Sequence, residues 1–93
     1  MKKNILAKKI TVTGKVQGVG FRYFVKQKAE SMGIGGWVRN TVDGAVEIFA
    51  EAEDYKINIL INFCKKGSVY SNVENIGIQS VQVEGNIFFK IKI

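Results

Sequence analysis

Two short segments carry residue types that could bind an anion and hold a water molecule. In residues 17–22, glycines stand at alternate positions, Gly18 and Gly20, and Arg22 follows directly. Such glycines let successive backbone N–H groups point inward as an anion site, and the guanidinium fork matches two phosphate oxygens. The segment is not a P-loop, and Tyr23 stands where G-x-G-x-x-G needs its third glycine. For Arg22 alone a surface role is the simpler interpretation, but loop and arginine together favour an anion site.

Asn40 is the second candidate, because it lies inside a segment typical of a strand, residues 36–41. Asparagine is depleted in strands, since its amide competes with backbone hydrogen bonds. It either begins a hairpin turn or provides a neutral amide that orients water and hydrogen-bonds a transition state. The segment by itself supports both interpretations equally.

The remaining inventory limits the chemistry. The 93 residues include no histidine and one cysteine, which excludes a histidine base and argues against structural zinc. We therefore expect no structural zinc site. A single cysteine cannot form an internal disulfide, which is typical of a reducing compartment. Cys64 falls on the apolar stripe of a predicted helix, so we interpret it as a buried structural thiol.

Alternating apolar residues predict the strands that must position the candidate site. The predicted strands cover about 8–16, 37–41, 46–51, 73–84 and 87–93. Asp43-Gly44 predicts a hairpin turn between the second and third. A phase slip within the fourth predicts a β-bulge near Ser80.

Apolar residues at helical spacing predict a helix over about 21–32, which stops at Gly33. The segment 53–66 fits a strand or a helix. Acidic residues at its start, lysines at its end and Gly67 after it favour the helix. Arg22 would then lie in a first helical turn, where a cation costs about 0.3–1 kcal/mol.

The β-α-β-β-α-β order, with one further strand, predicts an α+β ferredoxin-like sandwich with an antiparallel sheet and two helices on one face. The length supports a single domain over 1–93. Gly85-Asn86 favours a hairpin for the last strand. We interpret Trp37 and Phe21 as core or hinge packing. The N-terminal lysines are expected in a solvated, partly frayed end: Lys2, Lys3, Lys8 and Lys9.

The chain is basic, with 14 Lys and Arg against 8 Asp and Glu and a net charge of +6. This charge fits an anionic partner, although many small domains are simply basic. Gly20-Phe21-Arg22-Tyr23-Phe24-Val25 partly matches an RNA-recognition pattern, but Arg22 occupies the small-residue slot and the segment is predicted as helix. No apolar run is long enough to span a membrane. We therefore expect a soluble, cytoplasmic protein that binds neither nucleic acid nor membrane.

The two candidate segments closely resemble the acylphosphatases. The resemblance is carried by Gly14-Lys15-Val16-Gln17-Gly18-Val19-Gly20-Phe21-Arg22, by Gly36-Trp37-Val38-Arg39-Asn40-Thr41 and by Asp43-Gly44. It extends more weakly through Glu47 and Gly67-Ser68 to Phe89-Lys90-Ile91. The end of the chain departs from the Phe-x-Ile-Arg-Tyr of many members, with Lys92-Ile93 in the last two positions.

The resemblance implies hydrolysis of the carboxyl–phosphate bond of acylphosphates without a metal or a phosphoenzyme. It implies that Arg22 binds the phosphate with the loop amides and that Asn40 orients the attacking water. It also places the last strand beside the second, against the local hairpin signal. The implied partners are a small acylphosphate and inorganic phosphate, and we expect a monomer. A catalytically idle domain that recognises an acyl- or carbamoyl-phosphate is the remaining alternative. The implied phosphate-binding residues are Gln17, Gly18, Val19, Gly20, Phe21 and Arg22.

Overall fold

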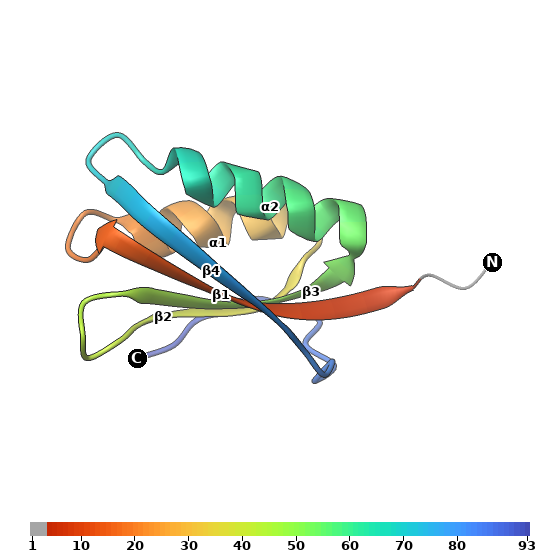
Figure 1. The fold of residues 1–93 in the computed structure, drawn as a ribbon. Helices are drawn as coiled ribbons and strands as arrows, with labels where there is room; N and C mark the ends of the chain where they lie inside the picture. The colour runs from red at the N-terminus through yellow and green to blue at the C-terminus, as the bar shows by residue number, and fades with distance from the viewer. Residues whose placement is uncertain (1–3) are drawn as a thin grey trace.

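The alternating apolar residues form a five-stranded sheet, and two amphipathic helices pack on one of its faces (Figure 1). The computed structural model describes residues 4–93. The predicted ferredoxin-like α+β fold is confirmed, and the ambiguous segment 53–66 is helical. The elements in chain order are β1 (Ile5–Lys15), α1 (Phe21–Ser31), β2 (Gly35–Asn40), β3 (Val46–Glu53), α2 (Asp54–Lys66), β4 (Asn72–Val81) and β5 (Phe89–Ile91).

The strand order is β4-β1-β3-β2-β5. Neighbouring strands are antiparallel except β2 and β5, which pair in parallel with Val38 opposite Ile91. The hairpin expected from Gly85-Asn86 is therefore wrong, and the arrangement implied by the family resemblance is confirmed. Because β4 and β5 lie at opposite edges, the connection over residues 82–88 must pass from one edge of the sheet to the other.

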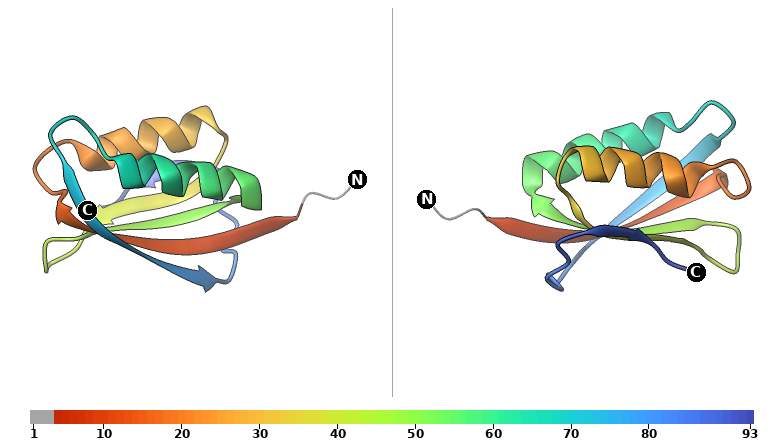
Figure 2. Two further views of the ribbon diagram at one scale, coloured as in Figure 1. Left: turned by 45° about the horizontal axis from the view of Figure 1, so that its top comes forward. Right: turned by 180° about the vertical axis from the view of Figure 1, so that it is seen from behind.

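Both helices lie on the same face of the sheet (Figure 2), and the buried core side chains come from these helices and from the sheet. Helix α1 packs over β2 and β5, and α2 packs over β1, β3 and β4. Phe21 is 1% exposed within this core, as predicted. The helix α1 ends near Gly33, whose N–H donates to the carbonyl of Glu30 at 3.1 Å. The fully buried side chains of the core include Ile10, Val12, Val25, Val38, Ile48, Ile57, Leu60 and Cys64.

The β-bulge lies at Glu74 and not near Ser80. The pairing of β1 with β4 shifts between Thr13, opposite Asn75, and Gly14, opposite Val73, whereas Ser80 pairs regularly with Lys8. Gly14 makes this close approach possible, because it has φ +121° and a β-carbon there would lie 2.2 Å from the carbonyl oxygen of Asn72. The apparent phase slip arose because the far end of β4 lies on the surface, with Ile78 49% exposed.

Part of the sheet face opposite the helices is covered by the 82–88 connection. Glu51 of β3 projects onto this face and is only 4% exposed. Its carboxylate accepts hydrogen bonds from the backbone N–H groups of Glu84, Gly85 and Asn86 at 2.8–3.0 Å, and from the Asn86 side chain. Burial raises the pKa of Glu51, but these hydrogen bonds, led by the Asn86 N–H, outweigh burial and leave the pKa below its ordinary value.

Two other expectations need correction. Trp37 is not a core residue: it is partly exposed on the face away from the helices, where it stacks on Phe49 with ring centroids 5.7 Å apart. Lys8 and Lys9 belong to β1 and form ion pairs with Asp54 at 3.4 Å and Glu47 at 3.6 Å, so they are not in a frayed end. Lys2 and Lys3 lie outside the described residues.

Neither helix among residues 4–93 has the length and hydropathy needed to cross a lipid bilayer.

Candidate active site

The loop at the end of β1 leads the chain directly into α1. Gly18 has φ +73° and Gly20 has φ +76°, a left-handed conformation that strains other residues. Gly20 is also the residue that caps α1, and it offers the helix no side-chain hydrogen bond. The glycines that the sequence singled out are therefore the residues that permit this abrupt entry into the helix.

The backbone amides before and at the start of α1 have no backbone partner among the described residues. The Phe24 N–H donates to the Gly20 carbonyl at 3.0 Å, but within residues 4–93 no amide from 17 to 23 donates to another backbone group. The first helical turn carries no acidic side chain, and Arg22 lies within it. Free N–H groups and the positive end of the helix dipole therefore lie beside a guanidinium. Such an arrangement attracts an anion.

A small hollow of about 180 Å³ opens at this helix end. Four of the residues that the sequence predicts to bind phosphate line it: Gly18, Gly20, Phe21 and Arg22. Phe21 offers its backbone, because its side chain is buried in the core. Gln17 and Val19 do not line the hollow; Val19 packs against the core instead.

The sequence did not identify the apolar side of the hollow, which consists of Val16, Tyr23 and Ile91. Tyr23 is 58% exposed and follows Arg22 in the helix. Ile91 comes from β5, and it lies there because β5 pairs in parallel with β2. Tyr23 could have been found from the sequence, because it directly follows Arg22. Ile91 could have been found only from the strand arrangement that the resemblance implies.

Asn40 is the last residue of β2 and lies outside the residues that line the hollow. It lies two positions after Val38, on the same face of the sheet, and Val38 pairs with Ile91 at the hollow. Its Oδ1 atom is buried, and no described group donates a hydrogen bond to it. An unpaired buried acceptor costs about 1–3 kcal/mol. Asn40 is next to Thr41, whose carbonyl oxygen accepts from Gln17. The free acceptor therefore lies near residues 17–21, which we call the anion loop.

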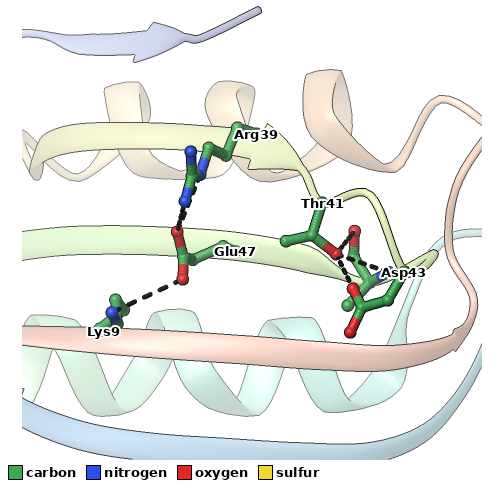
Figure 3. A network of polar contacts seen from close by, with 6 residues as sticks. Lys9, Arg39, Thr41, Asp43 and Glu47 are labelled. Carbon is green, nitrogen blue, oxygen red and sulfur yellow. Dashed lines mark hydrogen bonds and ion pairs between the residues drawn. The ribbon is translucent and has the colours of Figure 1, made fainter.

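Gln17 joins the loop to the β2–β3 turn. Its Nε2 atom donates to the carbonyl oxygens of Thr41 and Ala45, each at 2.8 Å. The Thr41 hydroxyl accepts from the Ala45 N–H at 3.0 Å and is hydrogen-bonded to Asp43, as Figure 3 shows. The hydrogen bond from Thr41 lowers the pKa of Asp43, which keeps this exposed carboxylate charged. The Gln17 side chain is thus committed to the turn, and only its backbone N–H is free for an anion.

The second arginine of the chain is engaged elsewhere. Arg39 projects onto the sheet face away from the helices, where its Nη2 atom lies 2.7 Å from Glu47 Oε1 (Figure 3). Glu47 also pairs with Lys9, and the Arg39 guanidinium lies 5.5 Å from the centre of the Trp37 ring. Although Arg39 precedes Asn40 in sequence, strand alternation directs it to the opposite face.

Cys64 is not one of the residues that line the hollow. Cys64 is buried in α2, and burial raises the pKa of its thiol to about 12, so it stays protonated. The interpretation of Cys64 as a structural thiol is confirmed. No three potential metal ligands of the His, Cys, Asp or Glu type come together in the part of the chain that the structure describes.

The sequence and the fold of this chain are similar to those of known proteins. The family model described as Acylphosphatase matches residues 8–91. An acylphosphatase of Acaryochloris marina is 44% identical over 78 residues, which are 84% of each chain. An acylphosphatase of Bacillus subtilis is 42% identical over 88 residues, 94% of this chain and 97% of the relative. The crystal structure of acylphosphatase from Bacillus subtilis superimposes with a TM-score of 0.92 at 40% identity, over 95% of this chain and 99% of that one.

Proposed function

The chain belongs to the acylphosphatase family, hydrolases of the carboxyl–phosphate bond, and on that premise we propose that Arg22, the 17–21 loop and Asn40 are its catalytic apparatus. Arg22 and the loop amides bind the phosphate group of an acylphosphate, and Asn40 orients the water that attacks phosphorus. The observation that carries the proposal is the free amides at the start of α1 beside the Arg22 guanidinium.

Phosphate binding at this hollow follows from its donors. The transition state of phosphoryl transfer spreads negative charge over three equatorial oxygens, and positioned donors stabilise it. Arg22 offers two parallel N–H groups to a pair of these oxygens. Amides held in place by the loop and by α1 need no reorganisation during the reaction, and one such donor is worth roughly 10²–10³ in rate.

The attacking water requires positioning rather than a strong base. The leaving group is a carboxylate, which departs without a proton from an acid, and the chain contains no histidine that could act as one. The Asn40 amide cannot remove a proton, but its buried, unpaired Oδ1 can accept a hydrogen bond from water. Alignment of that water with the leaving oxygen is an orientation effect. Tyr23 and Ile91 form the apolar side against which the acyl group would lie.

An assay with benzoyl phosphate tests the proposal. Arg22→Ala should lower kcat/KM by at least 10²–10³ and abolish competitive inhibition by inorganic phosphate. The matched control is Arg39→Ala, which removes the other arginine of the chain and should change kcat/KM by less than about twofold, because its partner Glu47 lies on the opposite sheet face. If Arg22→Ala hydrolyses benzoyl phosphate at the wild-type rate, the assignment of the site is wrong.

We further propose that residues 1–93 act as one domain, a cytoplasmic monomer that takes a small acylphosphate, releases inorganic phosphate and uses no cofactor, nucleic acid or membrane. Two observations argue against RNA recognition by the sheet: residues 20–25 form loop and helix, and Phe49 on central β3 is 4% exposed. A filter-binding titration with RNA should show no steep dependence on salt. Size-exclusion chromatography should give the mass of one chain.

A further inference from the structure

We propose that Gln17 is a positioning residue, whose carboxamide holds the anion loop and Asn40 at the separation that hydrolysis requires. The inference rests on the proposed function, because it assigns Gln17 a task between the two catalytic residues. It gives the Gln17 side chain a role as a link between two loops and leaves only the Gln17 backbone N–H as a phosphate donor.

The anion loop must be held in place without the use of its own amides. If these amides are to bind phosphate, they cannot also donate hydrogen bonds to the rest of the protein. In residues 4–93, the amides from 17 to 23 indeed make no backbone hydrogen bond. The loop must then be held by side chains. Val19 packs on the core, but an apolar contact has no direction; Gln17 supplies directed hydrogen bonds.

Both bonds of Gln17 end on the segment that carries Asn40. The Nε2 atom has two hydrogens, and its acceptors, the Thr41 and Ala45 carbonyl oxygens, each lie at 2.8 Å. Thr41 is covalently next to Asn40. The Thr41 N–H also donates to the Ala45 carbonyl at 2.9 Å, so the two acceptors belong to one closed turn.

The receiving turn needs Gln17 little for its own stability. Without Gln17, the Thr41 carbonyl still accepts from the Gly44 N–H at 3.3 Å, and the Ala45 carbonyl still accepts from the Thr41 N–H. No acceptor would be left without a donor, so removal of the Gln17 amide should change the position of the loop more than the stability of the fold. The expected effect is therefore on turnover, since a misplacement near 1 Å can cost about 10²-fold in rate.

Gln17→Met is the main test, because methionine keeps the length of the side chain and removes both donors. Gln17→Ala is the second variant, and Gln27→Met on the exposed face of α1 is the matched control. We expect Gln17→Met to lower kcat for benzoyl phosphate about 10-fold to 10²-fold, with the inhibition constant of inorganic phosphate changed less than about threefold. The control should leave both constants unchanged.

The same substitutions in an Asn40→Ala background separate positioning from general damage. If Gln17 acts through Asn40, its effect on kcat should shrink to less than about twofold once Asn40 is gone. An equal loss in both backgrounds would overturn the proposal, as would an unchanged kcat in both Gln17 variants. A weakened phosphate inhibition with normal kcat would instead make Gln17 a phosphate ligand. If Arg22→Ala and Asn40→Ala also keep full activity, the proposed site fails; if they lose it and Gln17 variants do not, only this inference fails.

Discussion

The Arg22 guanidinium and the free amides of α1 place positive charge around one hollow, so they repel one another when no anion is bound. A cation in the first turn of a helix opposes the dipole by about 0.3–1 kcal/mol. The residue proposed to bind phosphate is thus a local cost to the fold. An anion bound between guanidinium and amides reverses the sign of this interaction.

Arg22→Ala should therefore be no less stable than the wild type in phosphate-free buffer, and its free energy of unfolding should rise by about 0.3–1 kcal/mol. Added phosphate should raise the unfolding midpoint of the wild type, by mass action on the folded state, and leave the variant unchanged. Urea unfolding with and without phosphate measures both effects. A variant that loses more than about 1 kcal/mol in phosphate-free buffer would show that Arg22 has a structural role instead.

Asn40→Ala should separate binding from turnover. The substitution removes the acceptor for the attacking water but no phosphate donor, so kcat should fall by about 10²-fold or more while inorganic phosphate inhibits as before. Because Oδ1 is buried without a partner, its loss should not reduce stability. Steady-state kinetics with phosphate as inhibitor measure this split. Normal turnover would refute the role of Asn40.

At the residue level, the proposed site residues that the sequence could identify are those that stand out locally. Arg22 opposes the dipole of its helix, and Asn40 is unusual within a strand. The glycine pair before Arg22 permits a left-handed backbone, and the family motifs contain all of these residues. Tyr23 and Ile91 contradict nothing: a tyrosine on a helix surface and an isoleucine in a strand are ordinary. Their shared place at the hollow depends on the β2–β5 pairing, which the local turn signal at Gly85-Asn86 predicted wrongly.

Among the elements, the 82–88 connection depends on one carboxylate. Glu51 alternates with the core residues Ile48 and Ala50, a pattern typical of a side chain on the exposed face of a strand. No local pattern shows that a distant segment crosses above it. The Glu51 carboxylate accepts hydrogen bonds from three backbone N–H groups of this segment and holds it in place. Strand β5 follows directly after the segment.

Glu51→Gln should destabilise the protein, because the NH₂ group of the glutamine would face the N–H groups of the 82–88 connection. Two donors would then face each other without an acceptor. The loss should be about 1–3 kcal/mol at neutral pH. Since the folded-state pKa of Glu51 lies below its unfolded value, its contribution is present above the unfolded value of about 4.3 and disappears as the pH falls through the folded value. Urea unfolding from pH 7 to pH 3 measures this. The acid-side fall should be shallower in Glu51→Gln, and identical pH profiles would contradict the assignment.

The position of the β-bulge in β4 could not be predicted from the alternation of apolar residues alone. The sequence placed it where apolar residues change face, near Ser80, on the assumption that every apolar residue of β4 faces the core. The end of β4 is instead largely exposed, so the change of face there carries no information. Gly14, whose φ of +121° permits the real bulge, lies on the partner strand and was only part of a motif.

For the whole molecule, the distribution of charge says more about binding of an anion than the net charge of +6 does. Several basic side chains are neutralised by acids: Lys8, Lys9, Lys26, Arg39 and Lys56. In the proposed site, the specific attraction for an anion comes from one arginine and from amides that carry no formal charge. The fold class could be predicted from the order of elements, since that order admits few arrangements, whereas the charge total predicted only a preference for anionic partners.

Activity should be insensitive to chelators. The positive groups that phosphoryl transfer needs are supplied by Arg22 and the amides at the start of α1, so benzoyl phosphate hydrolysis should change by less than about 20% in excess EDTA. Initial rates before and after dialysis against EDTA measure this, with a magnesium-dependent phosphatase as the positive control. A loss of rate that added Mg²⁺ restores would contradict the proposed mechanism.

The parallel pairing of β5 with β2 also has a consequence for biosynthesis. The ribosome makes the loop, Arg22 and Asn40 early, but it makes β5 after the other six elements. Ile91 cannot complete the hollow until residues 89–91 have emerged and the connection has crossed to Glu51. Pairing across such long sequence separations is slow. A nascent chain therefore carries the polar groups of the proposed site well before the hollow is complete, and activity should first appear when β5 docks.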